Sequence, residues 1–152
     1  MTIQIRSAER KDHLFIATSQ VAMAFETEQL KLDPMIVEKG VMAVLNDSNK
    51  GEYFIAEIDH EPVACLLTIP EWSDWRNGTV LWIHSVYVLP QARKFGVFKA
   101  LYHHLKDKVQ ESAYLRGLRL YVDKSNTKAQ DVYTKLGMTN HHYELYEWMK
   151  TF

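Results

Sequence analysis

The amino-acid sequence predicts a single α/β domain over residues 1–152, in which helices flank a mixed β-sheet in the order βααβββαβαβ. Residues 80–88 are almost continuously apolar, β-branched or aromatic, as in a central strand that is covered on both faces. A loop with a glycine, a helical pattern and a second apolar run at 117–122 follow, which indicates a parallel βαβ crossover. With 152 residues and 47% hydrophobic content, the chain is long enough to bury one sizeable core.

Composition and charge limit the classes of function. The net charge of −1 and pI of about 6.7 give no basic surface for non-specific binding of nucleic acid. The single cysteine, Cys65, lies in an apolar run and is expected to be a buried small hydrophobe. The first residues lack the apolar region of a signal peptide, and no apolar run approaches the roughly 20 residues that span a bilayer. We therefore expect a cytoplasmic protein that binds neither nucleic acid nor membrane.

The first half of the chain reads as one strand, two helices and a hairpin. Alternation predicts a strand at 2–6, and Asp12 is a candidate N-cap for the helix that follows. Pro34 suits the first turn of a second helix. We expect helices from about 8 or 11 to 25 and from 34 to 45, an antiparallel hairpin of strands 53–58 and 63–69, and a loop at 71–79.

The second half carries the predicted crossover. Pro90 ends the central strand, because proline cannot donate to a sheet ladder. Beyond it we expect a helix at 96–112, a strand at 117–122, a helix at 126–136 and a last strand at 143–149. The aromatic residues of this last strand look exposed, so it is a candidate for pairing across a homodimer: Tyr143, Tyr146 and Trp148.

The first candidate site is the basic loop at the carboxyl end of the central strand. Residues 93–99 read Arg-Lys-Phe-Gly-Val-Phe-Lys and lead into a helix. The N-terminus of a helix offers unpaired N–H groups and the positive end of the macrodipole, so it suits an anion such as phosphate. An ordinary solvated basic turn explains the same residues about equally well.

The second candidate site lies on the helix at 126–136. Asn126, Ala129, Gln130 and Tyr133 fall on one stripe of that helix. Tyr133 suits a general acid, because a phenol with a pKa of about 10 can protonate a departing thiolate. The alternatives are an amphipathic packing role for Tyr133 and an N-cap role for Asn126.

Together, these two segments resemble the acetyl-CoA-dependent N-acetyltransferase (GNAT) superfamily. Its first motif, a strand ending V-x-P and then R-x-x-G-x-G/A, is matched by Val88, Pro90, Arg93 and Gly96. The second motif, N-x-x-A-x-x-x-Y-x-x-x-G-F/M, is matched throughout by Asn126, Ala129, Tyr133, Gly137 and Met138. The resemblance is close over residues 80–140, and the element order extends it along the chain.

The chain departs from the family pattern at two positions. Phe98 stands where the family has a small residue, so its ring must point away from the pyrophosphate or change how the pyrophosphate binds. His84 stands where the diamine acetyltransferase-like branch, the nearest one by resemblance, commonly has a glutamate proposed as base. Histidine can accept a proton at neutral pH. The alternative is a strand histidine with no catalytic role.

The resemblance implies transfer of an acetyl group from acetyl-CoA, as co-substrate and without a metal, to a primary amine of a small polyamine-like or amino-acid-like molecule. Tyr133 and His84 are the implied acid and base. The implied cofactor-binding residues are Val86, Tyr87, Val88, Arg93, Lys94, Phe95, Gly96, Val97, Phe98, Lys99, Asn126 and Tyr133.

The acceptor region implied by the resemblance lies between the first two helices and the loop before the central strand. There Glu26 and Glu28, with Trp72 and Trp75, would attract a cationic amine through charge and cation–π contacts. A solvated acidic turn is the alternative. At the level of the whole chain, the competing reading is a non-catalytic acyl-CoA-binding or regulatory domain on the same fold.

Overall fold

The computed structural model describes residues 1–151, which form two compact units, residues 1–119 and the residues from 120 onward. Each unit is described by itself. The predicted mixed α/β class is confirmed, and the extent of the domain, residues 1–152, stays a prediction. The first unit contains β1 (Ile3–Ser7), α1 (His13–Glu28), α2 (Pro34–Asn46), β2 (Glu52–Ile58), β3 (Glu61–Ser73), β4 (Gly78–Val88), α3 (Val97–Glu111), β5 (Leu115–Arg119) and two short 3-10 helices, η1 (Arg10–Asp12) and η2 (Pro90–Ala92).

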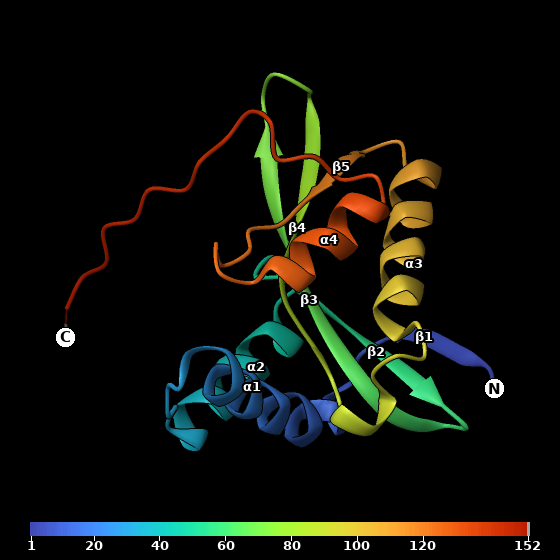
Figure 1. Cartoon of the computed structure of the whole chain (residues 1–152), viewed down its shortest axis with the longest axis vertical. Coiled ribbons are helices and arrows are strands. Elements are labelled where there is room, and N and C mark those ends of the chain that lie inside the picture. The colour runs from blue at the N-terminus through green and yellow to red at the C-terminus, as the bar shows by residue number, and fades with distance from the viewer. Residues whose placement is uncertain (152) are drawn as a thin grey trace. The chain divides into compact units, whose positions relative to one another are not determined.

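Five strands form one sheet in the order β1-β2-β3-β4-β5 (Figure 1). The first four are antiparallel neighbours, and β4 and β5 are parallel, so the predicted hairpin and crossover are both confirmed. The β3–β4 hairpin is longer than predicted, because Trp72 pairs with Thr79 inside the ladder. The expected loop at 71–79 therefore shrinks to the four residues between Ser73 and Gly78.

Helices α1 and α2 cover one face of the sheet and α3 covers the other (Figure 1). Alternate residues of each strand face opposite sides. The face under α1 and α2 is closed by a buried cluster from the two helices and the sheet: Ile16, Ala17, Val41, Tyr53, Ile55, Cys65, Leu67 and Tyr87. The predicted burial of Cys65 is thereby confirmed.

The opposite face of the sheet packs on α3. Phe54 of β2 meets His104 of α3 edge to face, with ring centroids 5.6 Å apart, and Lys108 lies over the same ring. Leu101 and Leu105, on the same stripe of α3, are fully buried. Burial of this stripe fixes α3 along the sheet, and hence fixes where its N-terminus lies.

The second unit contains one helix, α4 (Thr127–Lys135), and is otherwise without helices or strands over its described residues 120–151. The strand predicted at 117–122 lies earlier, as β5, and the strand predicted at 143–149 is extended coil instead. An alternating sequence forms a strand only where a neighbouring strand pairs with its backbone groups. None of the five paired strands comes from residues 143–149.

Candidate functional site

The ladder between β3 and β4 contains a bulge at His84. Leu67 pairs with Ser85 and Thr68 pairs with Ile83, so His84 is the extra residue between them. A bulge of this kind bends the strand and turns its side chain in a new direction. The His84 side chain keeps access to solvent, but neighbouring atoms desolvate its ring and lower its pKa. His84 is therefore a neutral imidazole at pH 7.

The residue after the bulge, Ser85, is buried, and sequence analysis did not single it out. Its hydroxyl is the one buried side-chain polar atom without a hydrogen-bond partner among the residues that the structure describes. Such a group is uncommon in a folded protein. No pattern in the sequence distinguishes this serine from the apolar residues around it.

The edge of β4 that faces away from β3 carries the N–H groups of Val86 and Val88. The N–H of Leu89 donates to the Val63 carbonyl at 2.8 Å, and backbone groups alternate along a strand, so those of Val86 and Val88 point to the other side. On that side β5 pairs only with Thr79–Trp82 in the described chain. The N–H of Val86 thus has no register partner in β5.

A small polar cluster marks the place where the pairing of β4 and β5 stops. Trp82 and Arg119 are the last register pair, and both bind the Glu71 carboxylate on β3, at 2.9 Å each. The two hydrogen bonds tie together three neighbouring strands at this point. Sequence analysis did not single out Glu71 as a site residue, because nothing in its surroundings identifies its partners.

The loop after β4 turns sharply into α3. Lys94 and Gly96 both have left-handed backbone conformations, with φ of 76° and 78°, and Gly96 is the N-cap of the helix. The first intrahelical bond runs from the N–H of Ala100 to the carbonyl of Gly96, at 3.0 Å. The N–H groups of residues 97–99 precede it, and the N-cap residue, Gly96, gives no side-chain hydrogen bond to them. This is the N–H arrangement that an anion needs.

Phe98 lies inside this first turn and its ring is turned along the helix. The ring stands 6.5 Å from that of Tyr102, which is one turn further on and buried. Phe98 itself is half-buried. The ring therefore extends toward the next turn of α3.

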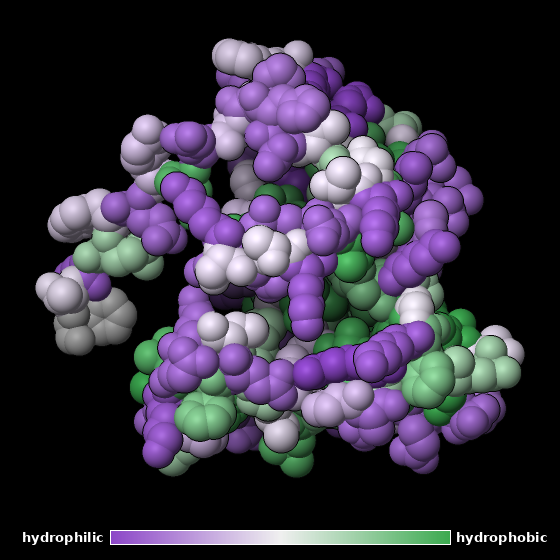
Figure 2. All heavy atoms as spheres, viewed as in Figure 1, coloured by the Kyte–Doolittle hydropathy of each residue, from purple (hydrophilic) through white to green (hydrophobic). Residues whose placement is uncertain are grey.

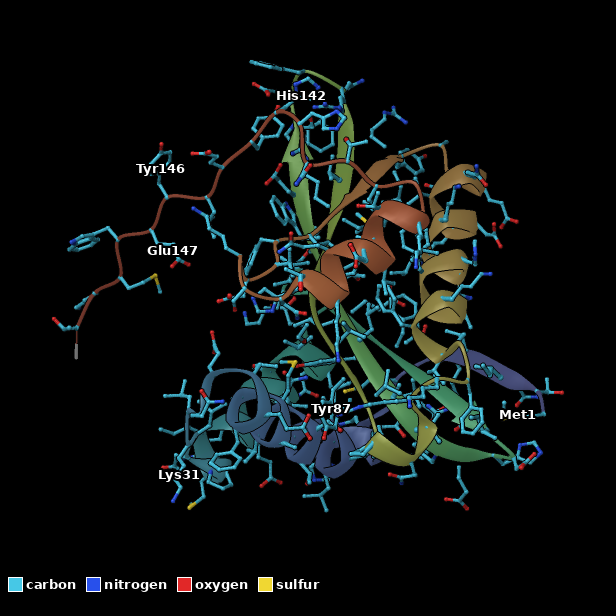
Figure 3. The ribbon with its side chains drawn as sticks, viewed as in Figure 1. Met1, Lys31, Tyr87, His142, Tyr146 and Glu147 are labelled. Carbon is cyan, nitrogen blue, oxygen red and sulfur yellow. The ribbon has the colours of Figure 1, made fainter. Side chains whose placement is uncertain are left out.

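Arg93, Tyr87 and Glu26 come together from the loop, β4 and α1. Arg93 donates to the Glu26 carboxylate at 2.8 Å and to the Val88 carbonyl at 3.0 Å, and its guanidinium lies 5.4 Å from the centre of the Tyr87 ring. The Tyr87 hydroxyl donates to the other Glu26 oxygen at 2.8 Å. Figure 3 shows Tyr87 between α1 and the end of β4.

The two hydrogen bonds alter the acidity of the groups in this cluster. Those from Tyr87 and Arg93 lower the pKa of Glu26, while burial and the bond to Glu26 raise the pKa of Tyr87. Sequence analysis assigned Arg93 to the cofactor and Glu26 to the acceptor. The structure joins the two residues in one ion pair.

The four predicted acceptor residues do not form one group. Glu26 and Glu28 are exposed on the last turn of α1, and the nearby apolar side chains of Phe25 and Leu30 are exposed as well. Figure 2 shows hydrophobic residues at the surface among hydrophilic ones. Trp72 lies opposite Thr79, eight residues along β4 from Tyr87, which is about 26 Å at the usual rise of a strand. Trp75, 89% exposed, is at the hairpin tip. A small molecule bound at Glu26 does not reach these tryptophans.

Asn126 and Tyr133 lie on α4, in the second unit. The Asn126 side chain accepts a hydrogen bond from the N–H of Ala129 at 3.2 Å, so Asn126 is the N-cap of this helix. Partial burial raises the pKa of Tyr133, which therefore stays protonated at neutral pH. The assignments of both residues to catalysis or to the cofactor stay predictions.

No cluster of three or more histidine, cysteine, aspartate or glutamate side chains among the described residues is arranged to bind a metal ion. None of the helices in the same part of the chain is long and apolar enough to cross a membrane.

The fold and the site define a mixed α/β protein in which a basic loop and the N-terminus of α3 follow the carboxyl end of β4, an arrangement that suits an anion. The sequence model of the Acetyltransferase (GNAT) family matches residues 19–138. The chain therefore belongs to the Acetyltransferase (GNAT) family, as the resemblance of its two motifs implies.

Individual relatives agree with this assignment. The mycothiol acetyltransferase of Streptomyces griseus subsp. griseus is 32% identical over 149 residues, which are 95% of this chain and 45% of that protein. The chain thus spans about half the length of this curated relative. The crystal structure of a possible acetyltransferase from Clostridium difficile 630 is 38% identical, with a TM-score of 0.93 over 100% of both chains.

A more distant structure supports the fold alone. An aminoglycoside N-acetyltransferase in complex with CoA is 15% identical, with a TM-score of 0.77 over 99% of this chain and 96% of that one.

Proposed function

We propose that this chain transfers an acetyl group from acetyl-CoA to a primary amine of a small molecule. The observation that carries the proposal is the first turn of α3, whose N-cap is a left-handed glycine, Gly96, on the loop that follows β4. Membership of the Acetyltransferase (GNAT) family supports the same reaction.

The loop and the first turn of α3 would hold the diphosphate of the donor. The N–H groups of residues 97–99 supply hydrogen bonds, and the exposed side chains of Lys94 and Lys99 supply positive charge. Bound acetyl-CoA would supply a thioester, whose carbonyl carbon is open to attack by an amine. The N–H of Val86, on the outer edge of β4, would donate to the carbonyl oxygen as negative charge develops on it.

His84 and Tyr133 would move the protons. An amine is protonated at pH 7, and His84, neutral because of its lowered pKa, would accept that proton directly or through water. The nitrogen would then form a bond to the carbonyl carbon and lose its extra proton to solvent, while the carbon–sulfur bond breaks. Tyr133, protonated because of its raised pKa, would give its proton to the departing thiolate.

The acceptor would approach beside the end of α1. Exposed Glu28 offers a carboxylate to a cation, whereas the charge of Glu26 is already balanced by Arg93. An acceptor that carries more than one positive charge would therefore gain only a modest attraction here. A polyamine-like or an amino-acid-like amine both fit this proposal.

The test begins with calorimetric titration of the protein with acetyl-CoA, CoA and ATP. We expect acetyl-CoA and CoA to bind and ATP to bind much more weakly.

A panel of polyamines, aminoglycosides and amino acids is then screened for thiol release with acetyl-CoA. Tyr133→Phe should lower kcat with little change in the affinity for acetyl-CoA. Binding of acetyl-CoA without turnover of any amine would favour an acyl-CoA-binding domain, and absence of binding would overturn the proposal.

A further inference from the structure

The carboxylate of Glu26 has two oxygens that differ in what holds them. Its Oε1 accepts a hydrogen bond from the hydroxyl of Tyr87, a buried residue of β4, at 2.8 Å. Its Oε2 accepts from Nη2 of Arg93 at 2.8 Å, in an ion pair whose side chains are about two-fifths exposed. All three residues belong to the first unit. The bond from Tyr87 fixes the carboxylate, whereas the ion pair with Arg93 is open to competition.

Arg93 does not depend on Glu26 alone for its position. Its Nε donates to the Val88 carbonyl at 3.0 Å, and its guanidinium lies 5.4 Å from the centre of the Tyr87 ring. A solvent-exposed ion pair contributes only about 0–1 kcal/mol. The guanidinium can therefore exchange Glu26 for another anion at little cost, while its other two contacts remain.

The loop that carries Arg93 leads to the place where such an anion fits. Arg93 lies three residues before Gly96, the N-cap of α3, and the N–H groups of residues 97–99 follow. Under the proposed function, on which this inference rests, these groups hold the donor diphosphate. A diphosphate carries two negative charges against one on Glu26, and a guanidinium binds phosphate oxygens in a bidentate manner. Because Glu26 and the diphosphate also repel each other, the guanidinium favours the diphosphate.

We propose that Arg93 exchanges Glu26 for the donor diphosphate, and that Glu26 then becomes a binding group for a cationic acceptor. Before the donor binds, Arg93 balances the charge of Glu26, so the carboxylate attracts a cation only weakly. After the exchange, Tyr87 still holds Oε1, and Oε2 is left for an ammonium group. The acceptor class is an amine that carries a positive charge when it binds. By linkage, a cation at Glu26 strengthens donor binding by the same factor.

The surroundings of Glu26 identify the charge that the exchange removes. Tyr87 from β4 and Arg93 from the loop both bind its carboxylate, and Glu28 is the next charged residue on its own helix. On α2, Glu38 pairs with His13 at 3.3 Å. Loss of Arg93 therefore takes away the positive charge that acts on Glu26.

The exchange has a proton signature. The bonds from Tyr87 and Arg93 together hold the pKa of Glu26 below its ordinary 4.5. Burial raises the pKa of Tyr87, so its hydroxyl stays protonated and continues to donate. Departure of Arg93 raises the pKa of Glu26 toward its ordinary value, and Glu26 then takes up protons near pH 5.

The experiment is calorimetric titration of the full chain with CoA at pH 5, in two buffers of different ionisation enthalpy, which counts the protons taken up. We expect the unmodified protein to take up about 0.2 of a proton more than Glu26→Gln does. Subtraction of the two proteins removes the titration of the groups of CoA itself. Dephospho-CoA, which keeps the diphosphate, should give the same difference, and acetyl-pantetheine, which lacks it, should give none. Glu28→Gln is the matched control and should keep the full uptake.

The second measurement uses spermidine as a cationic probe, titrated with and without saturating CoA at pH 7. CoA should strengthen spermidine binding about threefold to tenfold more in the unmodified protein than in Glu26→Gln. A gain that does not depend on Glu26 would overturn the role of Glu26 in holding the acceptor.

The outcomes separate this inference from the proposed function. If CoA bound without proton uptake that depends on Glu26, Arg93 would keep both anions at once, and the exchange would be overturned while the donor site stood. If CoA did not bind at all, the proposed function would fall together with the exchange.

Discussion

Under the proposed function, Arg93 is the residue at which the donor side and the acceptor side of the site would meet. Its guanidinium is held by the Val88 carbonyl and by Glu26, while its loop continues into the first turn of α3. Both side chains of the pair are about two-fifths exposed, so solvent screens their attraction. Under the proposed function, the pair adds little net charge beside the donor diphosphate, and removal of the negative charge of Glu26 would leave the positive charge of Arg93 unbalanced there.

Replacing Glu26 with glutamine should make acetyl-CoA bind more tightly, by about twofold to fivefold at low salt. Glutamine keeps the shape of the side chain and a carbonyl that can accept one of the two hydrogen bonds, while the negative charge beside Arg93 is lost. Calorimetric titration measures the change, which should shrink at high salt. Acetyl-pantetheine, which lacks the diphosphate, should bind the two proteins equally.

Glu28→Gln is the matched control for that experiment, since it removes the same charge on the same turn while the ion pair of Arg93 with Glu26 stays in place. Its effect on acetyl-CoA should be smaller. Weaker binding of acetyl-CoA by Glu26→Gln would show that Glu26 serves chiefly to position Arg93.

His84 sets the acidic limit of the proposed reaction. Desolvation lowers its pKa below the usual 6.5, and a base acts only while it is neutral. The rate kcat/KM should therefore hold from neutral pH down past 6.5 and fall only as the pH passes through the lowered pKa. His84→Gln should reduce kcat and remove this acidic limb, whereas exposed His103→Gln on α3 should leave it in place. An unchanged limb in His84→Gln would place the base elsewhere.

At the scale of elements, the sequence predicts most reliably where local pattern and packing agree. The apolar run of β4, Pro90 and Gly96 identify strand, stop and helix start, because each depends on the residues at that position. The β3–β4 hairpin was predicted too short, because Trp72 and Thr79 pair across a turn that has no single strong signal. The partnership of Glu26 with Arg93 was not predictable, because it joins residues far apart in the chain.

Asp12 connects three elements at the N-terminal edge of the sheet. It is 5% exposed, accepts two hydrogen bonds from Arg6 at 2.8 and 2.9 Å and accepts a third from the N–H of Glu9. Arg6 in turn binds Glu57 of β2 at 2.8 Å. These bonds join β1, η1 and β2, and they lower the pKa of Asp12 below its usual 3.8, with the bond from Arg6 as the largest cause.

Asp12→Asn should lower the free energy of unfolding by about 1–3 kcal/mol at pH 7, because Arg6 loses its charged partner. The lowered pKa means that Asp12 stabilises the fold above pH 3.8 and loses this contribution as the pH falls through the lowered value. The difference between the two proteins should therefore shrink in acid. Denaturant unfolding between pH 7 and pH 3 measures it.

Asp33→Asn is the control for this change, because Asp33 is an exposed N-cap of α2 and asparagine caps about equally well. Its stability should stay within about 0.5 kcal/mol of the unmodified protein at pH 7. A similar loss in both variants would assign the effect of Asp12→Asn to capping and not to the pair with Arg6.

For the molecule as a whole, binding of a ligand at the proposed site should also change the stability of the fold. A ligand that binds only the folded chain raises its free energy of unfolding, by about 2.7 kcal/mol at a hundred times its dissociation constant. For a chain of this length, that corresponds to a rise in Tm of very roughly 5–10 °C. Acetyl-CoA should produce such a rise, and ATP at the same concentration should not.

Gly96→Ala should both lower the basal Tm and remove most of this rise. The φ of 78° at Gly96 costs any residue with a Cβ about 1–2 kcal/mol, although there is space for the atom itself. Relief of this strain would move the N–H groups at the start of α3 away from the diphosphate.

Gly40→Ala is the matched change, because Gly40 lies inside α2 with open space around it. It should raise the basal Tm, since alanine favours helix by about 0.5–1 kcal/mol, and should keep the full response to acetyl-CoA. If Gly96→Ala kept the full response, the first turn of α3 would not be the site of the donor.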